Sequence, residues 1–341
     1  MPESTATISA PGPGHQDPLR PRALGRSGLQ TLPLALGGNV FGWTVKQEGA
    51  FGILDRFIEA GFSLIDTADV YPKWVPGNVG GESEMMIGKW LKSRGNRDRV
   101  LLATKVGGEM APGRKGLSAL HIKRALEESL RRLQTDYIDL YQAHYDDPAT
   151  GFEETLRAFA DLIGEGKVRA IGVSNHDVDR LKSALDIGKV HGLPRYETLQ
   201  PLYNLYDRQD FEQKFAPICR AEGLGVINYY SLASGFLTGK YRNEQDVKAS
   251  ARQRSNRKYL TERGFRILQA LDTVAARTGA KQSQIAIAWL IAQPDVTAPI
   301  VSATSLQQLE ELIVAARLRL DDEARALLNE VSAYEPEAEF T

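Results

Sequence analysis

The chain has only one cysteine among its 341 residues, so it cannot form an internal disulfide. Cys219 lies on the apolar side of a predicted helix, and we expect a reduced, buried thiol rather than a nucleophile. No apolar stretch approaches the roughly 20 residues needed to cross a bilayer. A net charge of -1 without long blocks of one sign argues against a nucleic-acid surface. These absences favour a cytoplasmic protein that partners neither membrane nor nucleic acid.

The N-terminus lacks the apolar core of a signal peptide. It is rich in Pro, Gly, Ser and Thr, so we expect a disordered tail over residues 1–21. Residues 22–335 are expected to form a single domain, because 42% hydrophobic and 25% charged residues are ordinary for a globular protein. The five histidines show no close ligand spacing, which disfavours a metal-dependent hydrolase, and we expect no metal.

Short aliphatic runs alternate with helical patterns along most of the chain. The runs are Leu34–Leu36, Phe62–Ile65, Val100–Ala103, Tyr137–Tyr141, Val168–Ile171, Tyr196–Leu199, Gly225–Ile227 and Val296–Ile300. The helical patterns include Phe51–Ala60, Ser118–Leu133, Glu153–Gly164, Val178–Lys189 and Phe211–Glu222. Strands that alternate with helices pair in parallel. We therefore predict the α/β class and a (β/α)8 TIM barrel, with long loops on its C-terminal face and extra helices. A doubly wound open sheet is the alternative.

Before the first run, the segment Arg22–Thr31 carries turn signals at Gly25 and Gly28. It predicts an N-terminal hairpin that closes the bottom of the barrel.

Four polar residues, Asp66, Tyr71, Lys105 and His144, fall just past the ends of predicted strands. A parallel barrel would bring these strand ends together on one face. A tyrosine hydroxyl, with a reference pKa near 10, needs help to donate a proton. Lys105 would stabilise the phenolate, Asp66 would hold the lysine charged, and His144 would donate to a carbonyl oxygen. The set would supply the proton of a carbonyl reduction, and a nicotinamide cofactor is the usual source of the hydride.

Each of the four has a simpler interpretation when taken alone. Asp66 would cap the following turn, and Tyr71 would pack in a loop. Lys105 would be solvated, and His144 would be a satisfied structural histidine. Only their combination is specific for catalysis.

The motifs that contain these residues resemble those of the aldo-keto reductase superfamily, in particular its bacterial-type members. They lie at Gly61–Tyr71, Ala103–Lys105, Leu133–His144 and Gly172–Asn175, and the resemblance runs from about Leu24 to Ala333. It implies an eight-stranded α/β barrel with Asp66, Tyr71, Lys105 and His144 as the catalytic tetrad. The implied activity is reversible, NADPH-dependent reduction of aldehydes or ketones to alcohols.

No Gly-x-Gly-x-x-Gly follows a predicted strand, so a Rossmann-type nucleotide site is disfavoured. The resemblance implies a different place for a dinucleotide. Ser174, Asn175 and Gln200 would hold the nicotinamide carboxamide, although turn chemistry is an alternative for the first two. Tyr229 would stack on the ring, with Tyr230 as its neighbour. Gly37 and Gly38 would leave room for the ribose or serve only as a turn.

The segment Asn228–Tyr241 resembles the family's phosphate-binding loop, although it lacks the commoner Ser-Pro after the aromatic residue. The residues expected to line the cofactor there are Leu232, Ser234, Gly235, Leu237 and Lys240. At the adenine end we expect Ser302, Thr304, Gln308 and Glu311, near a helix predicted to begin at about Ser305. No Arg or Lys lies between Val301 and Ala316 to bind a 2′-phosphate. The expectation of NADPH therefore rests on family habit rather than on these residues, and NADH is the alternative.

The substrate is expected to be a small carbonyl compound held by Trp43, Tyr71, Trp74 and His144. Loops at residues 72–81, 107–116 and 242–257 would form the rest of the pocket, which would accept aldehydes and ketones, including bulky ones. A different class of function stays open: relatives of this fold serve as cofactor-sensing accessory subunits of membrane potassium channels while keeping the tetrad.

Overall fold

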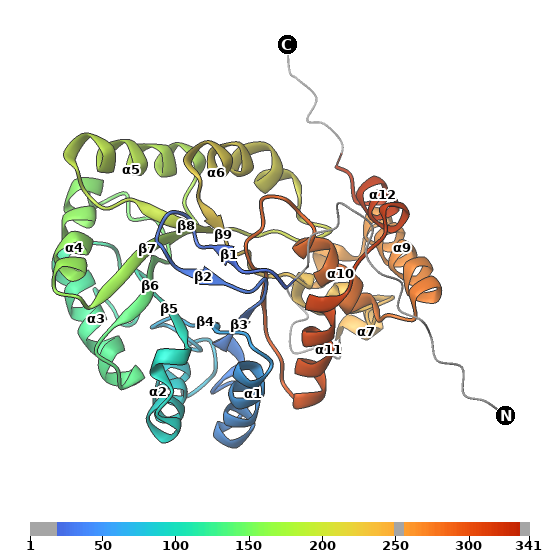
Figure 1. Cartoon of the computed structure of the whole chain (residues 1–341), viewed down its shortest axis with the longest axis horizontal. Coiled ribbons are helices and arrows are strands. Elements are labelled where there is room, and N and C mark those ends of the chain that lie inside the picture. Colours follow the sequence, from blue (N-terminus) through green and yellow to red (C-terminus); the bar gives the residue numbers. More distant parts are fainter. Residues whose placement is uncertain (1–18, 249–255, 335–341) are drawn as a thin grey trace, which may run out of the picture.

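A computed structural model of the chain describes residues 19–248 and 256–334. Residues 1–18 of the predicted tail at 1–21 and residues 249–255 of the predicted substrate loop at 242–257 lie outside these ranges. The central element is one parallel sheet of eight strands (Figure 1). In their order in the sheet the strands are β10 (Ile300–Val301), β3 (Ala35–Gly37), β4 (Leu64–Asp66), β5 (Leu101–Val106), β6 (Ile138–Ala143), β7 (Val168–Ser174), β8 (Tyr196–Gln200) and β9 (Gly225–Val226).

The sheet curls around until its first and last strands meet. The backbone N–H groups of Thr297 and Ala298 donate to the Val226 carbonyl at 2.8 and 3.2 Å, and the Ile300 N–H donates to Asn228 at 2.9 Å. These bonds join the β9 side of the sheet to the segment that enters β10. The structure therefore has the predicted (β/α)8 barrel and not the open doubly wound sheet.

Helices surround the strands, as expected for a parallel barrel (Figure 1). They are α1 (Gln47–Glu59), α2 (Glu82–Arg94), α3 (Ala119–Leu133), α4 (Phe152–Gly164), α5 (Val178–His191), α6 (Ala216–Glu222), α7 (Glu244–Lys248), α9 (Glu262–Thr278), α10 (Gln282–Ile291), α11 (Leu306–Arg317) and α12 (Asp322–Val331). Within the described ranges, none of these helices combines the length and apolar character that a membrane span requires. Cys219 is buried in α6, and burial raises the pKa of its thiol to about 12.

Several predicted elements differ from the structure by a few residues at their ends, and two of these differences have a physical reason in proline or in helix type. The last strand was expected at Val296–Ile300 but is β10 at Ile300–Val301, because Pro299 has no N–H and two consecutive amides before it share the Val226 carbonyl. The helix expected at Phe211–Glu222 begins as a π-type turn at Phe211–Phe215, and α6 follows with Pro217 in its first turn.

The predicted hairpin is present as the antiparallel pair β1 (Arg22–Ala23) and β2 (Gln30–Thr31). It lies across the middle of the ring of strands in Figure 1. Leu24 and Leu29 are buried in the apolar cluster inside the barrel, together with the opening residues of β3 and β4. The Arg22 guanidinium donates to the carbonyls of Ile291 and Val296 at 2.9 and 2.7 Å. The hairpin thus closes the end of the barrel at which the strands begin, leaving the opposite end for chemistry.

Candidate active site

The four residues predicted as catalytic meet at the C-terminal ends of β4, β5 and β6. Asp66 is the last residue of β4 and Lys105 the penultimate residue of β5, so both lie inside strands rather than just past them. His144 follows β6 directly, and Tyr71 lies in the loop after β4. The parallel register of these strands brings together residues that are up to 78 positions apart in the sequence.

Lys105 is fully buried and is the centre of the cluster. Its Nζ donates to Asp66 Oδ2 at 2.6 Å and to the Thr67 carbonyl at 2.8 Å, and it lies 3.5 Å from the Tyr71 hydroxyl. Asp66 Oδ1 accepts from the side-chain amides of Gln142 at 3.1 Å and Gln200 at 2.9 Å. The Asp66 carboxylate is therefore an internal partner of Lys105, and the turn-cap interpretation does not hold.

Burial sets the protonation of the cluster. Burial, and then the Asp66 carboxylate, raise the pKa of Tyr71 well above its ordinary value of 10, so the hydroxyl keeps its proton at neutral pH. Burial lowers the pKa of Lys105, and the Asp66 carboxylate opposes that change. Burial, and then the Lys105 charge, lower the pKa of His144 well below 6.5. The site therefore offers a neutral phenol and a neutral imidazole.

Aromatic rings extend from Tyr71 in two directions. Trp74 lies edge-to-face with Tyr71 at 5.5 Å between centroids, and Trp43 lies edge-to-face with Trp74 at 5.8 Å. On the other side, the His144 ring is 5.6 Å from Tyr71 and stacks on Tyr145 at 4.4 Å. The structure thus brings the predicted substrate residues together. Tyr145 was missed, although its position directly after His144 in a strand-end loop was a usable signal.

The residues predicted to clamp the nicotinamide carboxamide also lie together, and they bond to one another. Ser174 Oγ donates to the Gln200 carbonyl at 2.8 Å, and Asn175 Nδ2 donates to Ser174 Oγ at 3.0 Å and to the His144 carbonyl at 2.9 Å. The Tyr229 hydroxyl donates to Asn175 Oδ1 at 3.1 Å, while Tyr230 next to it is 47% exposed. Asn175 has a left-handed φ of 51°, which holds its amide in this network.

Gly37 and Gly38 have a packing reason to be glycine. A Cβ at Gly37 would lie 2.7 Å from Ser302 Oγ, and one at Gly38 would lie 2.8 Å from Ser83 Oγ. The space beside both glycines is thus filled by neighbouring side chains of the protein. The contact that these two positions show is internal packing, and their predicted contact with a ribose stays a prediction.

The segment predicted to bind phosphate forms a tight turn after β9. Left-handed φ angles occur at Ala233, Ser234 (57°) and Gly235 (95°). Leu232 packs against the core, and Ser234 and Leu237 are buried. Lys240 Nζ lies 3.5 Å from the position of a Cβ at Gly235, so the charge and the turn are neighbours.

At the predicted adenine end, the polar residues also have partners within the chain. Ser302 Oγ donates to Asn39 Oδ1 at 2.6 Å, and Thr304 donates to Gln308 Oε1 through both its N–H and its hydroxyl. Glu311 forms an ion pair with Lys281 at the start of α10. Helix α11 begins as predicted, with Ser305 Oγ accepting from the Gln308 N–H at 3.2 Å.

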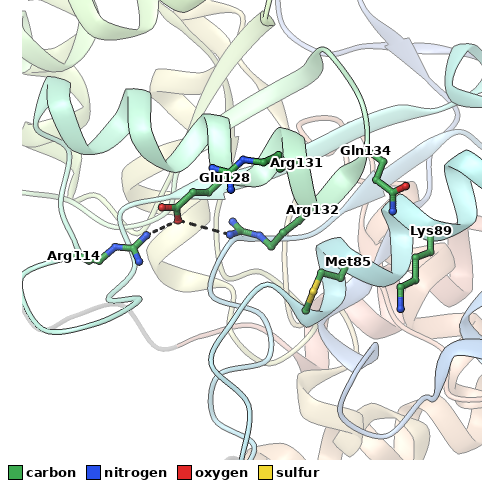
Figure 2. A pocket seen from close by; sticks show the side chains of 7 residues that line it. All are labelled: Met85, Lys89, Arg114, Glu128, Arg131, Arg132 and Gln134. Carbon is green, nitrogen blue, oxygen red and sulfur yellow. Dashed lines mark hydrogen bonds and ion pairs between the residues drawn. The ribbon is translucent and has the colours of Figure 1, made fainter.

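One surface pocket lies away from all of these residues, between α2 and α3 (Figure 2). It has a volume of about 460 Å³ and is lined by Met85, Lys89, Arg114, Glu128, Arg131, Arg132 and Gln134. Figure 2 shows Glu128 between Arg114 and Arg132, and its carboxylate neutralises part of the positive charge of the pocket. None of the predicted site residues lines it.

Comparison with known proteins agrees with the fold. A sequence profile described as "Aldo/keto reductase family" matches residues 33–333. The chain belongs to the aldo/keto reductase family. As an aldo/keto reductase it is an oxidoreductase by family, and the sequence resemblance described above is confirmed.

Three relatives illustrate the range of this aldo/keto reductase family. The "Uncharacterized oxidoreductase YrpG" of Bacillus subtilis is 36% identical, over 90% of this chain and 94% of its own length. The "Protein tas" of Escherichia coli is 32% identical, over 89% of this chain and 95% of its own. A "Probable voltage-gated potassium channel subunit beta" of rice is 33% identical, over 84% and 88%.

Proposed function

We propose that the protein reduces aldehydes or ketones to alcohols with NADPH, and that Tyr71 donates the proton. The observation that carries the proposal is the buried ammonium of Lys105, which touches both the Asp66 carboxylate and the Tyr71 hydroxyl. A buried lysine held 3.5 Å from a phenol can take up the negative charge that proton donation leaves on that oxygen. The ordinary structural roles of a lysine do not require that arrangement.

The chain's own groups then divide the work. Tyr71 holds the proton at its hydroxyl, and Lys105 stabilises the phenolate that forms. His144 makes no side-chain hydrogen bond to any described residue, so its ring is available to orient a carbonyl oxygen beside Tyr71. Trp43 and Trp74 supply an apolar wall for the substrate. A reduced nicotinamide cofactor, when bound, supplies the hydride.

The residues near the site fit a nicotinamide carboxamide. Gln200 Oε1 accepts no hydrogen bond from any described residue, and Asn175 and Ser174 retain acceptor capacity beside it. An amide NH2 group needs two such acceptors. We propose NADPH over NADH on family habit, with Lys240 and the turn at Ala233–Gly235 as the pyrophosphate site.

The rice relative motivates a second candidate function, that of an accessory subunit on a membrane channel. Its name describes it as a probable channel subunit, and it is similar over most of this chain. The two functions differ in turnover: a sensor would bind the cofactor without consuming it when a carbonyl compound is added.

The first experiment titrates the protein with NADPH and with NADH, followed by tryptophan fluorescence, and then adds a panel of aldehydes and ketones. The reductase proposal expects NADPH to bind and its absorbance to fall on carbonyl addition. Binding without consumption would support the accessory function, and no binding would reject both.

The decisive variant is Tyr71→Phe, which removes the proton donor and keeps the ring. We expect kcat for carbonyl reduction to fall between about 100- and 10,000-fold, with NADPH affinity changed by less than about twofold. The matched control is Tyr137→Phe, because that hydroxyl lies just before β6, at the opposite end of the barrel. Normal turnover by Tyr71→Phe would remove Tyr71 from the mechanism.

A further inference from the structure

Three buried side chains, Asp66 of the tetrad, Gln142 and Gln200, form a ring of hydrogen bonds. Of these, Gln142 has no role in the mechanism above. Gln142 Nε2 donates to Asp66 Oδ1 at 3.1 Å, and Gln142 Oε1 accepts from Gln200 Nε2 at 3.2 Å. Gln200 Nε2 closes the ring by donating to Asp66 Oδ1 at 2.9 Å. All three residues are at most 3% exposed.

The strands make room for this bridge. Gln142 is the penultimate residue of β6, and its neighbours in register are Lys105 on β5 and Gly172 on β7. A Cβ at Gly172 would lie 2.2 Å from Thr198 Oγ1 and 3.2 Å from the Gln142 Cγ, so the glycine there leaves room first for Thr198 and also for the glutamine. The side chain thereby links β4, which ends in Asp66, with β8, which ends in Gln200.

Chemistry fixes the direction of every bond in the ring. An ionised carboxylate only accepts, so both amides must turn their NH2 groups toward Asp66. An amide nitrogen has two hydrogens, and those of Gln200 are then committed to Asp66 Oδ1 and Gln142 Oε1. The only polar atom left on the Gln200 side chain is its Oε1, which can act only as an acceptor.

We propose that Gln142 is a positioning residue that locks the Gln200 amide with its oxygen toward the cofactor, so that the site selects the NH2 group of a nicotinamide carboxamide. This rests on the proposed function, in which Gln200 faces that carboxamide. Without Gln142, one N–H of Gln200 loses its acceptor, and Asp66 Oδ1 alone then holds the amide nitrogen. One hydrogen bond orients the amide less firmly than two, so the site would present its acceptor oxygen to the cofactor less consistently and its preference would weaken.

The test compares binding of NADPH with binding of its 3-acetylpyridine analogue, in which a methyl group replaces the carboxamide NH2. Both dissociation constants are measured by fluorescence on the intact protein, without turnover. In the wild type we expect the analogue to bind weaker by about 2- to 12-fold, the effect of one neutral hydrogen bond. In Gln142→Met, which keeps the length of the side chain, we expect that ratio to fall below the wild-type ratio.

Two further variants make the result decisive. Gln293→Met removes a partly buried amide whose Nε2 donates to the Trp289 carbonyl at 3.0 Å. This control variant should keep the wild-type ratio of the two dissociation constants. Gln142→Asn keeps an amide, but its side chain is too short to bridge Asp66 and Gln200, so it should also lower the ratio. It takes the place of Gln142→Met if that variant does not fold. If the wild type fails to bind NADPH, the proposed function itself fails. If the wild type binds and reduces carbonyls but the folded Gln142 variants keep its ratio, only the role of Gln142 is overturned.

Discussion

At the scale of single residues, Asp69 is the least expected feature of the site region. It lies between the tetrad members Asp66 and Tyr71, is 1% exposed, and neither carboxylate oxygen has a hydrogen-bond partner among the described residues. Burial, and then the charge of Glu84, raise the pKa of the Asp69 carboxyl well above 3.8, while Arg132 and Lys105 oppose that change. The folded protein therefore binds a proton at Asp69 more tightly than the unfolded chain does.

This carboxyl should make stability depend on pH in a defined direction. Above about pH 4 the unfolded chain has released the Asp69 proton and the folded protein retains it, so the free energy of unfolding falls as pH rises toward the folded pKa, by up to about 1.4 kcal/mol per pH unit. Asp69→Asn cannot titrate. We expect its stability relative to the wild type, measured by urea unfolding, to increase with pH from about pH 4 up to the raised pKa of the folded Asp69 carboxyl. The exposed Asp98→Asn is the control substitution. Parallel curves for Asp69→Asn and wild type would contradict the raised pKa.

The same scale shows where sequence reasoning works and where it stops. Tyr71 and His144 were predicted because polar residues directly after apolar runs contrast with their surroundings. Gln142 was missed because a single amide inside a strand gives no such contrast. Its importance comes from Asp66 and Gln200, which are 76 and 58 positions away and which only the closed barrel brings to it.

At the scale of elements, the hairpin offers a matched pair of glycines. Gly25 and Gly28 both have left-handed φ angles, 63° and 78°. A Cβ at Gly25 would lie 2.1 Å from the Glu197 carbonyl oxygen, whereas a Cβ at Gly28 meets nothing within 4 Å. An alanine at either position would therefore carry the same cost of a left-handed backbone, but only an alanine at Gly25 would collide with a neighbouring residue.

We expect Gly28→Ala to lower the free energy of unfolding by about 1 kcal/mol, the cost of a left-handed alanine. Gly25→Ala should lower it by at least about 2 kcal/mol more, because the hairpin must move off β8 to relieve the contact. Urea unfolding of both variants measures the difference. Equal losses would show that the hairpin is not held against β8.

Element boundaries were harder to predict than element types. The eight strands were expected from their aliphatic runs, and the hairpin from its two glycines. The end of β9 and the start of β10 depend on which backbone amides find partners where these two strands meet and close the barrel. A hydrophobic run does not indicate which amides those are. Pro299 was a visible signal for the late start of β10, because proline cannot donate to a ladder.

At the scale of the whole molecule, the barrel joins sequence-distant segments into one site. The tetrad comes from residues 66–144, and the predicted carboxamide clamp from residues 174–200. The closing seam between β9 and β10 supports both, because it fixes the curvature that aims all these strand ends at one place. Weakening this seam should therefore lower the stability of the whole barrel rather than change any one site residue.

Thr297 is the place to test that seam. Its hydroxyl oxygen accepts from the Val226 N–H at 3.0 Å, and the contact is buried. Thr297→Val keeps the shape of the side chain but leaves that N–H without its acceptor, so we expect a loss of about 1–3 kcal/mol in urea unfolding and faster hydrogen exchange at the Val226 amide. Thr273→Val, which removes an exposed hydroxyl bonded to the Gln269 carbonyl in α9, is the control and should change stability by less than about 0.5 kcal/mol. Equal effects of the two variants, or unchanged exchange at Val226, would mean that the Thr297 hydroxyl adds nothing to the closure of the barrel beyond the backbone hydrogen bonds at Val226 and Asn228.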